Sequence, residues 1–293
     1  MRSSHTLLVR AVSLAGLLGT VLLFAAWYQG QVPQAHAFHT HEELEEFERG
    51  AGLPIGENTY FKTSFSCNGC HGHDPTGFAM VTQEGGVDVN VVDDWRSTMM
   101  ANSAKDPFWR AKVSHEGLVN PAHKVGLEDK CTSCHAPAGR HNKHMLGLGP
   151  YSIAELDQDP NGIDGVSCVP CHIQSADSLG QRFSGELKFD TLDRPLLGPY
   201  GDVFGAPMTS FVGYQPVFGA HINDAGLCAG CHTLITETAD LEGNYTGQTF
   251  PEQATYHEWL NSKFNPEIAP EEAISCQGCH VPRIEDGVVI SAL

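Results

Sequence analysis

Basic residues are scarce in this chain of 293 residues. Lys and Arg together number 17 against 35 Asp and Glu, which gives a formal net charge of −18. A surface with this excess of negative charge repels phosphate-rich ligands and attracts cationic ones. Nucleic acid is therefore excluded as a partner. We expect docking to a basic protein or to a surface bridged by cations, unless the charge serves solubility alone.

Long apolar runs are also scarce, and the one clear run covers residues 11–27. Arg2 and Arg10 precede it, and an Ala-x-Ala cleavage site ends at Ala37. We predict an export signal over residues 1–37 and a periplasmic or extracellular mature protein. The run of about 17 residues is at the lower limit of a membrane span, so an uncleaved N-terminal anchor is the alternative. No cysteine lies in this segment, which excludes a lipidated N-terminus.

Cysteine is absent outside five short motifs. The ten Cys residues form five Cys-x-x-Cys-His sequences, for which chance predicts roughly 0.02 copies. The motifs, numbered 1 to 5 in chain order, are Cys67-Cys70-His71, Cys131-Cys134-His135, Cys168-Cys171-His172, Cys228-Cys231-His232 and Cys276-Cys279-His280. In such a motif two thioethers fasten a c-type haem and the histidine binds its iron. The sequence therefore predicts five covalently bound haems c.

Structural zinc and disulfide bonds are the alternatives for paired cysteines. A structural zinc site takes four ligands, so two cysteine pairs would make one site and five pairs would leave one pair over. Neither zinc nor a disulfide requires a histidine directly after every second cysteine. Residues 38–293 leave about 51 residues for each haem, too few for several separate cores. We therefore predict one pentahaem domain over 38–293, mainly α-helical with extensive irregular coil and few short strands.

Helix signals cluster near several histidines. Thr40 and Glu43 form a capping box that predicts a helix over 40–50. Asp106 before Pro107 and Asn120 before Pro121 predict two further helix starts. These starts place His115 and His123 on helices. A fourth helix is predicted from Pro251 to the break at Asn265-Pro266, and it carries His257.

Residues 173–220 lack Cys and His but are rich in turn formers and aromatic residues. We expect this stretch to form a small hairpin or an ordered loop over a haem face. Any specialised docking surface is expected here.

Each iron needs a second axial ligand, and its identity separates electron transfer from chemistry at iron. The preferred distal ligands are His115, His123, His144, His221 and His257. His221 and His123 lie seven and eight residues before a motif, so we expect them to ligate an adjacent haem. The other candidates are His141, the close competitor of His144, and then His39, His41 and His73.

Other side chains have weaker claims on the haems. Met99 and Met100 could ligate iron, but core packing on a helix over 95–104 is favoured. Candidates for pairing with haem propionates are Arg110, Lys112, Lys124 and Arg140, with ordinary surface charge as the alternative.

Three segments carry a resemblance to a known group of proteins. The segments 94–109 (DWRSTMMANSAKDPFW), 131–137 (CTSCHAP) and 165–168 (GVSC) are similar to bacterial multihaem c-type cytochromes of respiratory and extracellular electron transfer. The resemblance implies close-packed haem pairs that form a continuous electron path, mostly bis-histidine ligation, and a location outside the cytoplasm. Related proteins often continue further, so we expect either a short member of this group or a fragment of a longer protein.

The leading hypothesis is therefore electron transfer between a membrane or periplasmic donor and a terminal reductase or external acceptor, with no bond chemistry. The first alternative is a reductase or oxidase of a small nitrogen or sulfur compound at one open haem. All five motifs end in His, so the lysine-ligated haem of typical nitrite reductases is missing. The second alternative is a protomer of a haem-lined filament, with His39 or His41 ligating a neighbour's haem. Redox partner proteins are expected in each case.

Overall fold

The computed structural model describes residues 52–240, 242–281, 283–285 and 287–290. The chain divides into two compact units, Met1–His41 and Glu42–Leu293, and all described residues belong to the second. The predicted signal segment, the helix expected over 40–50, and His39 and His41 lie outside the described residues. Within the described ranges, no helix has the length and apolarity needed to cross a membrane.

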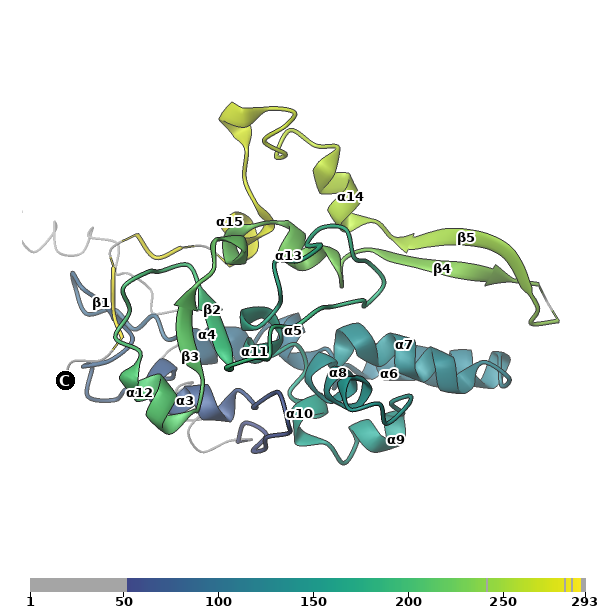
Figure 1. The fold of residues 1–293 in the computed structure, drawn as a ribbon, viewed down its shortest axis with the longest axis horizontal. Coiled ribbons are helices and arrows are strands. Elements are labelled where there is room, and N and C mark those ends of the chain that lie inside the picture. Colours follow the sequence, from purple (N-terminus) through teal and green to yellow (C-terminus); the bar gives the residue numbers. More distant parts are fainter. Residues whose placement is uncertain (1–51, 241, 282, 286, 291–293) are drawn as a thin grey trace, which may run out of the picture. The chain divides into compact units, whose positions relative to one another are not determined.

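Short helices joined by irregular chain dominate the described residues (Figure 1). The first half holds α3 (Phe65–His71), α4 (Val91–Arg96), α5 (Met99–Asn102), α6 (Pro107–Val119), α7 (Lys124–His135), α8 (Pro137–Met145), α9 (Ile153–Leu156), α10 (Pro160–Ile163) and α11 (Cys168–His172). The second half holds α12 (Ala206–Phe211), η1 (Ala220–Asn223), α13 (Gly226–Ala229), α14 (Thr255–Leu260), η2 (Pro270–Glu272) and α15 (Cys276–His280). The predicted fold class, mainly α with few strands, is confirmed.

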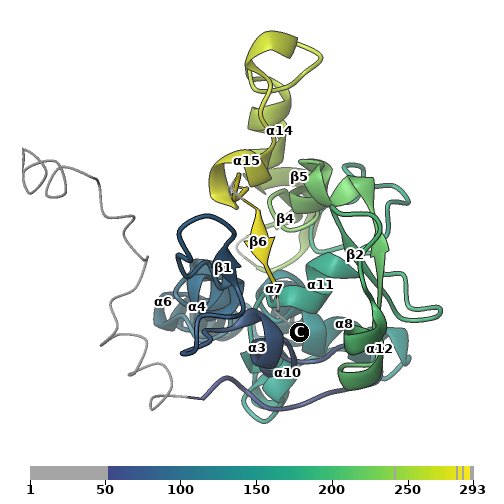
Figure 2. The same ribbon diagram turned by 90° about the vertical axis from the view of Figure 1, so that its left-hand side faces the viewer.

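The strands of the described residues form three two-stranded sheets. The antiparallel pairs are β1 (Val81–Thr82) with β6 (Val288–Val289) and β4 (Leu234–Ala239) with β5 (Tyr245–Gln253). The pairing of β1 with β6 brings the chain after motif 5 to the chain after motif 1 (Figure 2). The third pair, β2 (Pro195–Gly198) with β3 (Gln215–Phe218), is parallel. The hairpin considered for 173–220 is therefore wrong, because α12 lies between the strands and lets both run in the same direction.

The cap signals near α6 and α7 had different outcomes. Asp106 caps α6 as predicted, since its carboxylate accepts a hydrogen bond from Trp109 N at 2.7 Å and Pro107 opens the helix. The helix start predicted at Asn120 is wrong. Asn120 instead ends α6 by donating its backbone N–H to the Glu116 carbonyl, and α7 begins at Lys124 after a turn. His123 is consequently the residue before α7 and does not lie on a helix.

The helix start predicted at Pro251 is also wrong. Pro251 lies inside β5 opposite Ile235, at an irregularity in the pairing with β4. Proline is tolerated at such positions because its missing N–H costs no ladder hydrogen bond there. The helix α14 begins four residues later at Thr255, and it does carry His257 as predicted.

The helix expected over 95–104 is broken into α4 and α5 by Thr98, which adopts an extended backbone and accepts a hydrogen bond from Ala101 N. The break turns Met99 and Met100 outward, with 72% and 38% of their surfaces exposed. Core packing of these two methionines is therefore wrong, and Ala101 and Ala104 occupy the buried positions instead.

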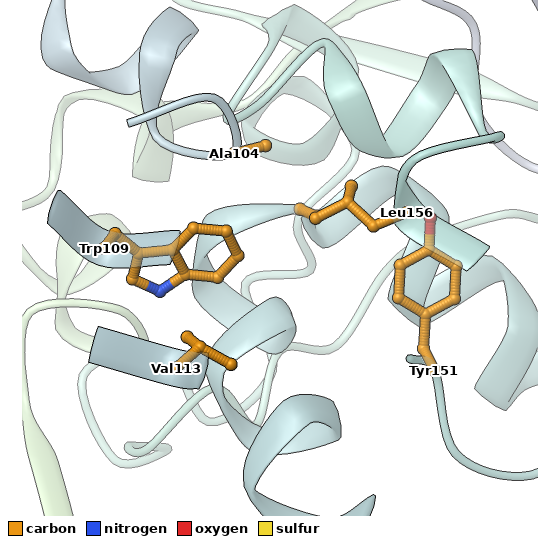
Figure 3. Packing of buried hydrophobic residues seen from close by; sticks show 6 residues of the cluster. Ala104, Trp109, Val113, Tyr151 and Leu156 are labelled. Carbon is orange, nitrogen blue, oxygen red and sulfur yellow. The ribbon is translucent and has the colours of Figure 1, made fainter. Parts of the chain in front are cut away.

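The buried apolar residues fall into three small clusters, each next to haem motifs. The first joins α6 to α9 (Figure 3). Cys131 of motif 2 packs against it. The second includes Val169 of motif 3, and the third includes Ala229 of motif 4 and packs against Cys276 of motif 5. The core thus supports the motifs from several sides and is not one continuous interior.

Candidate haem sites

All five motifs lie on helical turns. Motifs 1, 3 and 5 coincide with α3, α11 and α15, and motif 2 forms the last turn of α7. Motif 4 begins in α13, and its turn continues because His232 N donates to the Cys228 carbonyl at 2.9 Å. A helical turn brings residues i and i+3 to the same face. Each pair of thiols is therefore positioned to attach to one porphyrin edge.

Motifs 1 and 3 lie side by side although about 100 residues separate them in sequence. Interaction with the Cys168 thiol lowers the pKa of Cys67, and the same interaction raises the pKa of Cys168. The two motif histidines are also close: burial lowers the pKa of His71, and the neighbouring His172 lowers it further. Haems attached at these motifs would be neighbours.

Motif 4 has several neighbours. Interaction with the Cys231 thiol lowers the pKa of Cys134 of motif 2 to about 7. Burial raises the pKa of Cys228 to about 12, with further contributions first from Cys276 of motif 5 and then from Cys171 of motif 3. Direct contacts agree with this arrangement. Cys276 packs against the cluster that contains Ala229 of motif 4, and Gln174, two residues after motif 3, donates to the Leu227 carbonyl directly before motif 4. Motif 4 therefore adjoins motifs 2, 3 and 5. Together with the pair of motifs 1 and 3, these contacts connect all five motifs.

Two motif histidines are held in the orientation that iron binding requires. His135 Nδ1 is 3.1 Å from the Ser103 carbonyl, and His172 Nδ1 is 2.6 Å from the Leu197 carbonyl. Trp109 stacks on the His135 ring with centroids 4.5 Å apart and planes 10° apart. A histidine that donates Nδ1–H to a carbonyl presents Nε2 to the metal and is a stronger ligand. Both residues therefore fit the proximal role predicted for them.

Three of the preferred distal histidines use Nε2 within the protein. His123 Nε2 is 2.7 Å from the Gly243 carbonyl in the β4–β5 turn, His144 Nε2 is 2.7 Å from an Asp129 oxygen, and His221 Nε2 is 2.8 Å from the Gln174 carbonyl. Gln174 follows His172 by two residues. The ring of His221 thus lies beside motif 3, which is not the motif that follows it in the chain. As distal ligands, all three would have to exchange these bonds for iron.

The other two preferred candidates keep Nε2 out of the hydrogen bonds of the described residues. His257 uses Nδ1, which is 3.4 Å from Thr233 Oγ1, next to His232 of motif 4. His115 is exposed on α6, with Nδ1 4.0 Å from a Glu116 oxygen. The position of His257 supports its candidacy more directly, because a motif lies beside it.

Polar groups of the protein hold the lower-ranked candidates His141 and His73. His141 is 4% exposed, and burial lowers its pKa to about 3. Its Nε2 is 3.0 Å from the Ser133 carbonyl inside motif 2. His73 Nδ1 is 2.5 Å from an Asp88 oxygen, a carboxylate–histidine contact that also occurs around metal-bound histidines.

The four basic residues considered for haem propionates all pair with carboxylates of the protein, namely Arg110 with Asp157, Lys112 with Glu116, Lys124 with Glu128 and Arg140 with Asp129. Within the described part of the chain, buried N–H groups of Arg140, Arg182 and Arg194 nevertheless find no hydrogen-bond partner, namely Arg140 Nε, Arg182 Nε, and Arg194 Nε and Nη2. Buried guanidinium groups are good partners for carboxylates, which haem propionates would supply. Sequence reasoning missed Arg182 and Arg194, since no local pattern distinguishes them from surface arginines.

The donor set as a whole fits haem c. Ten free thiols occur in pairs on helical turns, a histidine follows each pair, and buried arginine donors are available for carboxylates. Among the residues that the structure describes, no three Cys, His, Asp or Glu side chains come together as a metal-ion cluster.

A comparison with protein families gives one match. The family described as cytochrome c554 and c-prime matches residues 66–173, a segment that contains motifs 1, 2 and 3. Searches of curated proteins and of solved structures give no match. The family match and the geometry of the motifs together support a c-type cytochrome, with covalently bound haem and a role in electron transfer.

Proposed function

We propose that this protein conducts electrons through five covalently bound haems c, without bond chemistry of its own. The observation that carries the proposal is the connected set of motifs. Motif 1 adjoins 3, motif 3 adjoins 4, and motif 4 adjoins 5, while motif 2 branches from motif 4. Haems attached in this order would give electrons a continuous route through the protein.

The two ends of this route are the most accessible motifs. Cys70 of motif 1 and Cys279 of motif 5 are exposed, whereas the other eight cysteines are partly buried. We infer that electrons enter and leave at haems 1 and 5, between a membrane or periplasmic donor and a reductase or external acceptor. The predicted signal over 1–37 supports export of the chain. Haem, when bound, supplies the redox-active iron, and the chain holds it through thioethers and histidine.

Haem-deletion variants test this order. Replacing both cysteines of motif 4 (Cys228→Ala with Cys231→Ala) removes the link between haem 5 and the rest. Electron paramagnetic resonance of the oxidised protein should then show haem 5 as an isolated low-spin centre. Deleting motif 2 in the same way (Cys131→Ala with Cys134→Ala) is the matched control, since haems 1, 3, 4 and 5 stay adjacent. Equal spectra for haem 5 in both variants would contradict the order.

The same spectra test the alternative of a catalytic haem. Five low-spin ferric signals are expected if every iron has two protein ligands. A high-spin signal would indicate an open iron and would favour the reductase or oxidase alternative.

A further inference from the structure

Asp164 is a fully buried carboxyl group that lies between the helices of motifs 1 and 3. Its exposed fraction is 0%. One oxygen accepts a hydrogen bond from Ser64 N at 2.7 Å, and the other accepts from Ser64 Oγ at 2.8 Å. Ser64 directly precedes α3, so Asp164 is tied to the start of the motif 1 helix.

The serines that precede the helices of motifs 1 and 3 interact with the Asp164 carboxyl group and do not cap their helices. Ser64 precedes α3 and Ser167 precedes α11, yet neither side chain caps its own helix. Ser275 in the same position before α15 does cap, by accepting from Gly278 N. The Ser167 hydroxyl lies near enough to Asp164 to lower the pKa of that carboxyl group. Ser167 Oγ is itself buried and makes no hydrogen bond of normal geometry to the described residues. A protonated Asp164 would need an acceptor for its new O–H, and Ser167 Oγ offers one.

The segment that carries Asp164 is held rigidly. Gly165 has φ +70°, and a Cβ there would lie 2.6 Å from the Met100 carbonyl oxygen. Val166 N donates to the same carbonyl at 2.9 Å, and Trp95 Nε1 donates to the Val166 carbonyl at 2.8 Å. These contacts fix the backbone next to Asp164, so its carboxyl group stays buried whether it is charged or neutral.

Opposing influences act on the Asp164 charge. Burial raises its pKa most, while the hydrogen bonds from Ser64, the Ser167 hydroxyl and the positive charge of Lys105 lower it. Lys105 is exposed, and Arg96 is the cation that acts on Lys105 in turn. The other titratable groups that sense Asp164 are the thiols of Cys67 and Cys168, which become uncharged thioethers once haem is attached. An added charge on a nearby iron would shift this balance.

We propose that Asp164 binds a proton when haem 1 or haem 3 is reduced, so that electron transfer through this pair is coupled to proton uptake. The proposal rests on the proposed function. In the step, a ferric iron gains one electron from the redox partner and becomes ferrous, while the carboxylate gains one proton from solvent. The proton neutralises the negative charge that the electron brings into the low-dielectric site.

Potentiometric titration of the holoprotein at several pH values tests the coupling. One proton per electron lowers a midpoint potential by about 59 mV for each tenfold fall in proton activity, and partial coupling gives less. In the native protein one of the midpoints should fall with rising pH in this way. In Asp164→Asn that dependence should disappear, with the midpoint fixed near the low-pH value of the native protein. Asp157→Asn is the matched control, because this exposed carboxylate pairs with Arg110 and should leave the dependence unchanged.

Two further measurements keep the test decisive. The redox-difference infrared spectrum should show the C=O band of a protonated carboxyl group on reduction, and the band should be lost in Asp164→Asn. Ser64→Ala, which removes one donor to the carboxylate, should move the pH-dependent range upward. A pH dependence that survives Asp164→Asn would overturn the proposal, and so would midpoints that do not change with pH. Haem content is measured first. Native protein without haem would contradict the proposed function, whereas pH-independent midpoints in fully loaded native protein would contradict only the role of Asp164.

Discussion

At the scale of single residues, the motif histidines depend on neighbours far away in the sequence. His135 is fixed by the Ser103 carbonyl and by the stacked ring of Trp109, which comes from α6. The Cys-x-x-Cys-His pattern predicts the histidine but gives no information about its supports. Asp106 could be predicted as the cap that places Trp109, and this cap is present.

Trp109→Ala should destabilise the folded protein strongly. Trp109 is 9% exposed and belongs to the cluster against motif 2, so truncation should lower the unfolding free energy by about 3–5 kcal/mol. Denaturant titration followed by helical circular dichroism measures this change. The neighbouring Phe108→Ala is the control, because Phe108 is 81% exposed and should cost little. Equal losses for the two variants would contradict the packing described for α6.

Asp129 should contribute stability that is lost in acid. Burial alone raises its pKa, but hydrogen bonds from Arg140, Tyr151 N and His144 outweigh burial and lower it below the ordinary 3.8. A lowered carboxyl pKa stabilises the folded state above about pH 4, and this contribution is lost as pH falls through the folded-state pKa. Asp129→Asn should therefore cost about 1–3 kcal/mol at pH 7 and less below pH 4. A loss in denaturant titrations that is independent of pH would be contrary to this expectation.

At the scale of elements, local signals predicted helices well only where no distant partner intervened. The motif turns and the start of α6 follow from residues close in sequence. The strand β5 could not be predicted, because Pro251 fits both a helix start and an irregular strand position, and only pairing with β4 decides between them. The parallel pairing of β2 with β3 likewise depends on contacts that no sequence period records.

Gly165 supplies a test at this scale. Gly165→Ala places a Cβ 2.6 Å from the Met100 carbonyl in a left-handed conformation, so the loss should exceed the about 1 kcal/mol of backbone strain alone. Gly149→Ala is the matched control, since Gly149 has φ +83° but no heavy atom within 4 Å of its added Cβ. Thermal unfolding should therefore rank Gly165→Ala clearly below Gly149→Ala. The reverse order would show that the contact between segments 100–103 and 164–166 is not as described.

At the scale of the whole molecule, net charge should govern encounters with redox partners. A net charge of −18 attracts cationic acceptors and repels anionic ones, and salt screens both effects. Oxidation of the reduced protein by hexaammineruthenium(III) should slow as ionic strength rises, whereas oxidation by ferricyanide should accelerate. Stopped-flow absorbance gives both rates, and parallel salt responses would argue against electrostatic steering.

The molecule as a whole is organised around the adjacency of its five motifs. Sequence reasoning predicted their number and chemistry from the repeated Cys-x-x-Cys-His pattern. It could not predict that motif 4 adjoins three others, because contacts between segments about 50–100 residues apart leave no local signal. The same limit applies to the choice among the candidate distal histidines. That choice depends on residues that are close only in the folded protein, such as Thr233 beside His257 and Gln174 beside His221.

The intact mass of the mature protein, purified from a host that attaches haem c, tests the central claim most directly. We expect the mass of the polypeptide plus five haems, retained after denaturation because the attachment is covalent. A mass equal to the polypeptide alone, or haem that separates on denaturation, would contradict the account.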